Sequence, residues 1–374
     1  MKVAINCAFY EPKGGGTKEY IDNLVNNLAE LVTDEEIILY VLQDQLNFAQ
    51  KNLPGKFKIK TIPFNSGSKI NRIKRSLFEQ KFWRKEEEIE KFDIFHSPFF
   101  HSPEFKKAKI LLTVHDLRLY RYPESYEFFR YQFLKRRVKE SIKNASHIIT
   151  VSDFTKSEVM ELCRVPENKI TTIHEAINHH RFSWKDNAFP SVLPKEMKEM
   201  KFILSVGNLE PRKNFENRIE VFKKIKEKPE FKDLNLVIGG RRDHSYKRVL
   251  KLMESTEGII YLDFLYKEEL VWLYKNALLY VFPSFYEGFG FPPVEAGSLG
   301  TISAVSNVSS IPEICGEGAF YFSPDNKEEM QMVIERALTD KEMALEIREK
   351  MQQRLKDFSW QKNAKETLDI YHSL

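Results

Sequence analysis

The chain has 374 residues, of which 42% are hydrophobic and 30% are charged, and its formal net charge is only +4. This length favours two domains, the apolar content suffices for two buried cores, and the weak net charge argues against nucleic acid as a partner. Three widely spaced cysteines predict free thiols of a reducing compartment rather than disulfides or a metal site. The N-terminus enters a strand rather than a signal peptide, and no apolar run is long enough to span a membrane, so we expect a cytoplasmic protein.

In the first half of the chain, short apolar runs alternate with stretches of helical periodicity, a pattern typical of a parallel α/β sheet. It predicts strands at residues 2–8, 37–42, 58–63, 92–96, 109–114, 148–151 and 169–173. Three glycines, among them Gly15 and Gly16, join the first strand to a helix over 18–31. Such a turn lets a ligand approach the backbone closely, although it equally suits a flexible connection and lacks the spacing of a dinucleotide-binding loop.

The strand at 109–114 ends in His115 and Asp116. Open α/β sheets bind ligands at the carboxyl ends of their strands, so His115 is a candidate functional residue, with a purely structural histidine as the alternative. An aromatic and basic segment follows, and it predicts a long helix that ends near residue 144.

Positive charge is concentrated in residues 51–150, which hold 23 Lys and Arg against 11 Asp and Glu. The densest part, residues 69–85, predicts a basic amphipathic helix or loop. Its basic residues are Lys69, Arg72, Lys74, Arg75, Lys81, Arg84 and Lys85, and they interleave with Ile70, Ile73, Leu77, Phe82 and Trp83. This segment suits an anionic membrane surface, a solvated helix face or an acceptor-binding surface, and the sequence leaves all three open.

Residues 179–200 contain two prolines and no clear periodicity, which predicts a linker. A second series of strands is expected at 201–206, 234–239, 259–264, 277–282, 301–305 and 318–322, and helices at 326–356. The strand at 201–206 leads through Gly207-Asn208-Leu209-Glu210-Pro211-Arg212-Lys213-Asn214 into a helix. At that turn Arg212 offers a planar fork and Lys213 a compact charge, which together suit a diphosphate, with a solvated charge pair as the alternative.

The strand at 277–282 is followed by Pro283-Ser284-Phe285-Tyr286-Glu287-Gly288-Phe289-Gly290-Phe291-Pro292-Pro293-Val294-Glu295-Ala296-Gly297. The glycines permit a sharp turn and the two prolines suit the first turn of a helix, which predicts a strand, a glycine loop and a helix start. The free amides and the positive end of such a helix favour anionic or oxygen-rich ligands. This string, with Glu287 and Glu295 separated by seven residues, resembles the motif of retaining glycosyltransferases of family 4. An ordinary helix start with solvated carboxylates is the alternative.

The resemblance extends to Thr113–Leu117, to the turn at 207–214 and to 307–313, and it covers nearly the whole chain. It implies the GT-B fold, with two Rossmann-like parallel-sheet domains that face each other across a cleft. The domains would comprise residues 1–178 on the acceptor side and 201–356 on the nucleotide-sugar side, with 179–200 as linker and 357–374 as a helix returning to the first domain. Where the family often carries a glycine after the last strand of the first domain, this chain has Glu175-Ala176-Ile177-Asn178.

The family's activity is transfer of a sugar from a nucleotide donor to an acceptor, with retention of the anomeric configuration. The similarity leans to bacterial mannosyltransferases of polysaccharide assembly, so we expect GDP-mannose as donor, with donors of rhamnose, fucose or glucose also open, and a glycan or lipid-linked glycan as acceptor. Glu295 would bind the ribose, and Arg212 and Lys213 would neutralise the diphosphate. By the same resemblance the donor site comprises Gly15, Gly16, Arg212, Lys213, Glu287, Gly288, Phe289, Gly290, Phe291 and Glu295, and the acceptor passes His115.

Retention could use Glu287 as a nucleophile, as in retaining glycosidases. Alternatively, the acceptor attacks on the side of the leaving group and the diphosphate takes its proton, with Glu287 binding sugar hydroxyls, as the family resemblance implies. No Asp-x-Asp string stands at a predicted strand end, so we expect no metal ion and no further cofactor. Two other functions remain open, a nucleotide-sugar epimerase on the same scaffold and a non-catalytic protein that binds nucleotide sugars.

Overall fold

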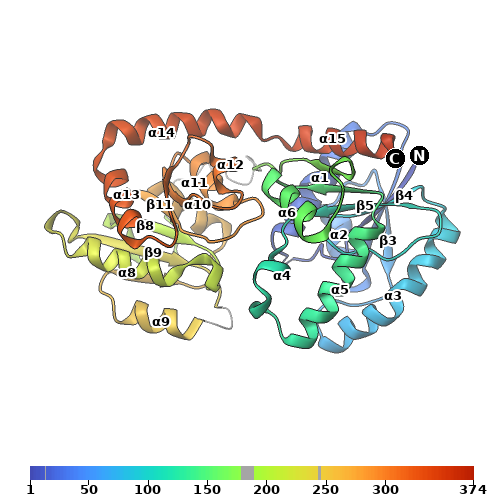
Figure 1. Cartoon of the computed structure of the whole chain (residues 1–374), viewed down its shortest axis with the longest axis horizontal. Coiled ribbons are helices and arrows are strands. Elements are labelled where there is room, and N and C mark those ends of the chain that lie inside the picture. Colours follow the sequence, from blue (N-terminus) through green and yellow to red (C-terminus); the bar gives the residue numbers. More distant parts are fainter. Residues whose placement is uncertain (13, 178–188, 243–245) are drawn as a thin grey trace. The chain divides into compact units, whose positions relative to one another are not determined.

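The computed structural model describes residues 1–12, 14–177, 189–242 and 246–374, apart from the side chains of residues 69, 70, 72–74, 76 and 246 (Figure 1). The chain forms two compact units, one of Met1–Ala176 with Ser359–Leu374 and the other of Ile177–Phe358. Of the predicted linker at 179–200, residues 179–188 lie outside the described residues, and the remainder includes a short 3-10 helix at Lys195–Glu199.

The first unit is built on a seven-stranded sheet whose order is β3-β2-β1-β4-β5-β6-β7. All neighbouring strands are parallel. The strands are β1 (Lys2–Asn6), β2 (Glu36–Leu42), β3 (Lys58–Ile62), β4 (Ile94–Ser97), β5 (Lys109–Val114), β6 (His147–Thr150) and β7 (Ile170–Thr172). Inner strands of a parallel sheet are covered on both faces, which explains why β2 and β5 are almost continuous apolar runs, whereas the edge strand β3 alternates lysine with apolar residues and is only partly buried. All seven strands lie at predicted positions.

Six helices connect these strands: α1 (Gly16–Leu31), α2 (Leu46–Asn52), α3 (Lys69–Glu90), α4 (Arg118–Arg121), α5 (Phe128–Asn144) and α6 (Asp153–Cys163). The predicted basic helix at 69–85 is confirmed as α3 and continues to Glu90. Trp83, one of the apolar residues that the membrane alternative would insert into lipid, is 1% exposed and does not fit that alternative. Its ring packs against Tyr40 and Phe95 in the core, at 4.8 and 4.7 Å between centroids.

The C-terminal helix α15 (Trp360–Ser373) belongs to the first unit and packs along α1 (Figure 1). Nδ1 of the buried His96 lies 2.6 Å from the hydroxyl of Tyr371, and the amide of Asn363 donates to the carbonyl of His174 at 2.9 Å. The ring of Trp360 lies 5.7 Å from that of Tyr20 on α1. The predicted return of the C-terminal helix to the first domain is therefore confirmed.

The second unit holds a six-stranded parallel sheet with the order β10-β9-β8-β11-β12-β13. Its strands are β8 (Lys201–Val206), β9 (Leu234–Gly239), β10 (Ile259–Leu262), β11 (Leu279–Phe282), β12 (Ser303–Ser306) and β13 (Phe320–Phe322). The two sheets and the returning helix confirm the predicted pair of Rossmann-like domains.

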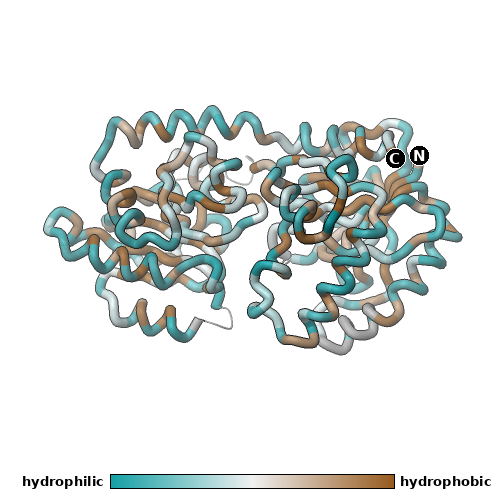
Figure 2. The backbone as a smooth tube through the Cα atoms, viewed as in Figure 1, coloured by the Kyte–Doolittle hydropathy of each residue, from teal (hydrophilic) through white to brown (hydrophobic). Residues whose placement is uncertain are grey.

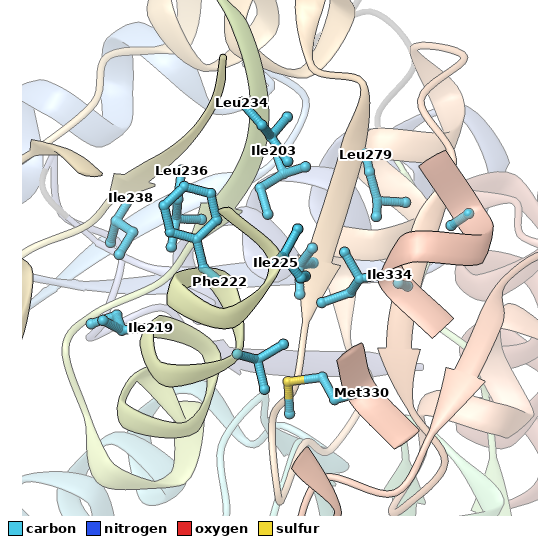
Figure 3. Close-up of a cluster of buried hydrophobic side chains, with 14 of the residues drawn as sticks. Ile203, Ile219, Phe222, Ile225, Leu234, Leu236, Ile238, Leu279, Met330 and Ile334 are labelled. Carbon is cyan, nitrogen blue, oxygen red and sulfur yellow. The ribbon is translucent and has the colours of Figure 1, made fainter. Parts of the chain in front are cut away.

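The α-helices in the described part of this unit are α8 (Phe215–Lys226), α9 (Tyr246–Glu254), α10 (Lys267–Asn276), α11 (Phe291–Ser298), α12 (Ile311–Cys315), α13 (Lys327–Thr339) and α14 (Lys341–Arg354). Figure 3 shows how α8 contributes to the core: Phe222 and Ile225 lie against strand residues such as Ile203 and Leu236. Met330 and Ile334 of α13 complete this cluster. The helical spacing of these apolar residues is what buries one face of each helix.

Hydropathy follows the architecture, because the strands of both sheets are hydrophobic while the outer helix α14 is mostly hydrophilic (Figure 2). Among the described residues, no helix combines the length and apolar character needed to cross a bilayer.

Candidate active site

In the second unit, strand order brings two predicted motifs together. The strands β8 and β11 are neighbours in the sheet, and both are parallel, so the turns that follow them lie at the same edge. The turn after β8 contains Arg212 and Lys213, and the turn after β11 contains Glu287. A backbone hydrogen bond of 2.8 Å from the amide of Phe285 to the carbonyl of Arg212 joins the two turns. Motifs 74 residues apart thus form one site.

The centre of this site is a carboxylate held by two cations. Nη1 of Arg212 donates to Oε2 of Glu287 at 3.0 Å, and Nζ of Lys213 lies 2.5 Å from Oε1 of the same carboxylate. Arg212 also donates to the carbonyl of Tyr286 at 2.9 Å and, through Nε, to Oε2 of Glu210 at 2.8 Å. Lys213 and Glu287 are each only 9% exposed, so the pair is largely screened from water.

The ionisation of this cluster follows from two opposing effects. Burial by itself would raise the pKa of Glu287, but the charges of Lys213 and Arg212 outweigh it and lower that pKa below its usual value. Burial lowers the pKa of Lys213, and the neighbouring carboxylate of Glu287 opposes this effect. At neutral pH Glu287 is therefore an anion whose two oxygens are both engaged by cations.

A third cation, Arg218, was not identified from the sequence. It lies on the buried face of α8, 2% exposed, and its Nη2 donates to the carbonyl of Lys213 at 2.8 Å. Its Nε and Nη1 have no hydrogen-bond partner among the described residues, and burial lowers its pKa to about 9. The sequence feature that could have identified Arg218 is its position between Phe215 and Ile219, as a basic residue on an otherwise apolar helix face. Through its hydrogen bond to the carbonyl of Lys213, Arg218 stabilises the turn and adds positive charge near it.

The local sequence explains how the turn after β8 is built. Asn214 adopts a left-handed conformation with φ of 55° and thereby ends the short helical turn Pro211–Lys213 and begins α8. Asparagine tolerates this conformation better than most residues, and its amide donates to the carbonyl of Pro324 at 2.8 Å. The chain at Gly240 lies so close to this turn that a Cβ there would stand 2.0 Å from the carbonyl oxygen of Gly207. The conformation of the turn that carries Arg212 and Lys213 is therefore fixed by its contacts with Pro324 and Gly240.

The glycine loop after β11 has the predicted form. Gly290 has φ of 96° and precedes α11, whose first turn contains Pro292 and Pro293. Gly288 does not adopt a left-handed conformation. Ser310 donates its hydroxyl to the carbonyls of Glu287 and Phe289, at 3.0 and 2.9 Å, and thereby holds the loop. These serine contacts were also missed, although they belong to the 307–313 segment that the sequence marked as family-like.

Phe289 and Phe291, the apolar members of the predicted donor site, lie with ring centroids 4.8 Å apart. Glu295 lies further along α11 and has a different partner from Glu287. Its Oε2 accepts a hydrogen bond of 3.2 Å from the hydroxyl of Tyr274, a buried residue of α10. Tyr274 was not predicted as a site residue. It orients the carboxylate assigned to the ribose.

The remaining predicted residues belong to the first unit. Gly15 precedes α1 and Gly16 is its first residue, and a Cβ added to either would meet no atom within 4 Å. His115 follows β5; its Nδ1 lies 2.9 Å from Oε1 of Glu175, and its Nε2 lies 3.2 Å from the carbonyl of Pro98. Glu175, 3% exposed, belongs to the stretch Glu175-Ala176-Ile177-Asn178, which lacks the glycine that the family often carries there. The sequence marked this departure but not its partner.

The sequence matches two family models, Glycosyltransferase Family 4 over residues 14–181 and Glycosyl transferases group 1 over residues 190–354. It is 30% identical over 285 residues to the O-antigen chain mannosyltransferase B of Escherichia coli, a match that covers 75% of this chain and 74% of that protein. Its identity to the O-antigen chain mannosyltransferase RfbU of Salmonella typhimurium is 33% over 227 residues, 60% of this chain and 59% of RfbU.

A third similarity is partial. The chain is 28% identical over 249 residues to the serotype-specific mannosyltransferase WbdA of Escherichia coli, which is 65% of this chain but only 30% of WbdA. Among solved structures, sucrose-phosphate synthase from Thermosynechococcus elongatus superimposes with a TM-score of 0.77 at 18% identity, covering 100% of this chain and 98% of that one. WaaG, a glycosyltransferase involved in lipopolysaccharide biosynthesis, gives a TM-score of 0.70 at 14% identity, covering 98% and 99%. At these identities the likeness concerns the fold.

Proposed function

This chain belongs to glycosyltransferase family 4 and has the GT-B fold, and from that premise we propose that it transfers mannose from GDP-mannose to a glycan or lipid-linked glycan, with retention of the anomeric configuration. The choice of mannose is supported by the names of its relatives, O-antigen chain mannosyltransferase B and RfbU. The observation that carries the proposed chemistry is the cluster of Arg212, Lys213 and Glu287 at the carboxyl edge of the second sheet.

In this proposal the cations stabilise the leaving group. Negative charge develops on the diphosphate as its bond to the sugar C1 breaks, and preorganised cations in a water-poor site act most strongly on such charge. Lys213 and Arg212 would bind the phosphates directly, while the buried Arg218, bonded to the carbonyl of Lys213, would add positive charge behind them. A diphosphate that enters the turn competes with Glu287 for these cations, which frees the Glu287 carboxylate to accept hydrogen bonds from sugar hydroxyls.

The same contacts favour attack on the side of the leaving group over a glycosyl-enzyme intermediate. In the free protein both oxygens of Glu287 are bound to cations and its pKa is lowered, and with the donor bound the proposal has them engaged by sugar hydroxyls, so the carboxylate is a weak nucleophile in either state. We therefore infer that the acceptor oxygen bonds to C1 as the C1–O bond to the diphosphate breaks, and that the acceptor proton passes to a diphosphate oxygen. No metal ion or further cofactor enters this step.

The test is a donor screen with purified protein and a mannose-terminated, lipid-linked acceptor, in which the release of free nucleotide is measured. We expect GDP release from GDP-mannose only when the acceptor is present, and an α-mannoside by NMR from the α-linked donor. Equal turnover with and without EDTA would support independence of metal. A β-linked product would overturn retention, and preference for another nucleotide sugar would overturn the donor. An epimerase would instead change the nucleotide sugar without an acceptor, and a non-catalytic protein would bind it unchanged.

We also propose that the acceptor is presented at an anionic membrane surface, with the protein peripheral on its cytoplasmic side. Large exposed apolar side chains gather on two helices of the first unit, Leu77 and Phe78 on α3 and Phe128, Phe129 and Phe133 on α5. A hydrogen bond of 2.6 Å from Arg137 to Glu79 holds the two helices together.

Basic residues also occur along both helices. Helix α5 carries six Lys and Arg but only one Glu, and Lys81, Arg84 and Lys85 of α3 are exposed. Lys69, Arg72 and Lys74, also predicted for this surface, have side chains outside the described part of the structure. Basic residues near anionic lipid contribute about 1 kcal/mol each, and aromatic side chains add shallow insertion. The basic and aromatic face of α3 and α5 therefore fits a lipid surface.

A further inference from the structure

The ring of His115 has an unusual pair of partners. Its Nδ1 lies 2.9 Å from Oε1 of Glu175, and its Nε2 lies 3.2 Å from the carbonyl oxygen of Pro98. A carbonyl oxygen only accepts hydrogen bonds, so Nε2 must carry a proton. An ionised carboxylate also only accepts, in which case Nδ1 carries a proton too and the ring is an imidazolium.

The alternative is a neutral ring that accepts a hydrogen bond from a protonated Glu175. Both arrangements contain the same number of protons, so the question is which group holds the shared one. A glutamic acid is normally more acidic than an imidazolium by about two pKa units, which favours the ring as the holder. Burial alone would lower the pKa of His115, but Glu175, the carbonyl of Pro98 and Asp116 together raise it above its usual value.

The other groups around His115 carry no competing charge at neutral pH. The ring of Tyr20, on α1, lies 4.8 Å away and nearly perpendicular, and burial raises the pKa of that phenol. His96, on β4, has a pKa lowered to about 3 by burial and is neutral. Its ring nitrogens contact the hydroxyls of Tyr371 and Thr113, at 2.6 and 2.9 Å. Of these two histidines, His96 is thus kept neutral and His115 is paired with a buried carboxylate.

We propose that Glu175 is a positioning residue that keeps His115 as an imidazolium at neutral pH. His115 then acts as a fixed cation and hydrogen-bond donor toward a substrate oxygen, and never as the base that deprotonates the acceptor. The longer of its two contacts, to Pro98, is the one a substrate oxygen can replace, while Glu175 holds the opposite edge of the ring. The charge state stands on the contacts of this chain alone, whereas the role in transfer rests on the proposed function.

The charge state can be measured without any substrate. In full-length protein labelled with 15N-histidine, ring nitrogen shifts followed from pH 5 to 9 should show His115 doubly protonated at pH 7, with the His115→Asn variant providing the assignment. Glu175→Gln should lower the pH at which His115 loses its proton by about 1–3 units, because an opposite charge at this distance has been removed. Glu158→Gln is the matched control: Glu158 is an equally buried carboxylate of the same unit, it pairs with Arg121, and its loss should leave His115 unchanged.

The second measurement is the pH profile of kcat with the donor and acceptor that prove active. The imidazolium exists below the pKa of His115 and is lost as pH rises through it, so kcat should fall on the alkaline side. Glu175→Gln should move that fall to lower pH and recover turnover in acid, while Glu175→Asp should retain most of the wild-type profile.

A neutral His115 at pH 7 in the wild type, or a Glu175→Gln variant with an unchanged titration, would overturn the proposal. If Glu175→Gln does not fold, Glu175→Asp and the wild-type titration still decide the charge state. A protein that shows the predicted titration but turns over no nucleotide sugar would refute the proposed function while leaving the charge state established.

Discussion

Lys213 and Glu287 are each other's closest charged partners, with Nζ 2.5 Å from Oε1 across 74 positions of sequence. The sequence assigns them to different parts of a donor, the lysine to the diphosphate and the glutamate to the sugar. In the folded protein they form one buried ion pair. On the proposed function, a donor would exchange this internal pair for two contacts to itself, and the first three predictions test that exchange.

Lys213→Ala should lower kcat by about 10²–10³-fold, the loss typical of one preorganised electrostatic donor. Binding of guanosine, which lacks phosphates, should change little. Lys223→Ala, which removes an exposed lysine of the neighbouring helix α8, is the control and should keep wild-type turnover. An unchanged kcat in Lys213→Ala would show that this lysine only balances Glu287.

Glu287→Gln should destabilise the free protein by about 3–5 kcal/mol, because it leaves buried cations without their counter-charge. GDP should then stabilise the variant more than the wild type, since its diphosphate supplies the missing negative charge and no longer competes with a carboxylate. Thermal unfolding with and without GDP measures both effects. Equal GDP-induced increases in the unfolding temperature of the two proteins would contradict the proposed competition between GDP and Glu287.

The pH dependence of stability should report the same pair. The pKa of Glu287 in the folded protein lies below its usual value because of Lys213 and Arg212, after their charges outweigh the opposing effect of burial. The stabilisation is therefore fully present above the unfolded pKa of about 4.3 and is lost as pH falls through the lower folded pKa. Urea unfolding between pH 7 and pH 3 should show a steeper acid loss for the wild type than for Glu287→Gln. If the unfolding free energies of the two proteins fell in parallel with pH, the Glu287 carboxylate would not be paired with cations in solution.

Glu295→Ala should weaken GDP binding by about 1.5–3 kcal/mol, the usual cost of losing a charge-assisted hydrogen bond. Isothermal titration calorimetry is the measurement, and Tyr274→Phe should give a smaller loss in the same direction because the hydroxyl that orients the carboxylate is gone. Glu317→Ala, at an exposed site of the same unit, should bind GDP like the wild type. Wild-type affinity in Glu295→Ala would remove this residue from the nucleotide site.

Vesicle flotation tests the membrane surface. The wild type should float with vesicles that contain anionic lipid and should detach as salt rises, because exposed charges are screened within about 10 Å at 0.1 M. Phe129→Ser, at a side chain that is 86% exposed, and the double variant Arg136→Glu with Lys139→Glu should each reduce flotation. Met332→Ser, at a 62% exposed apolar side chain of the second unit, should have no effect. Failure of the wild type to float at low salt would leave this face as ordinary surface.

Much of the fold could be predicted from the sequence because strands, turns and helix starts are indicated by residues close together in the chain. Inner strands such as β2 and β5 are short apolar runs because a strand that is covered on both faces of a parallel sheet has no polar face. The loop before α11 could be predicted because Gly290 must adopt a positive φ and the prolines after it suit only the start of a helix. The string from Pro283 to Gly297 therefore indicated both the local structure and the family.

Only the tertiary structure decided which of these residues meet, because strand order is a property of long-range pairing. Placing β11 next to β8 joins Glu287 to Lys213. The segment that follows β7 brings Glu175 to the end of β5, where it pairs with His115 from 60 residues away. The sequence by itself determined which charged residues stand at the ends of strands. Their protonation depends on burial and on partners from distant segments, and both exist only once the sheets have formed.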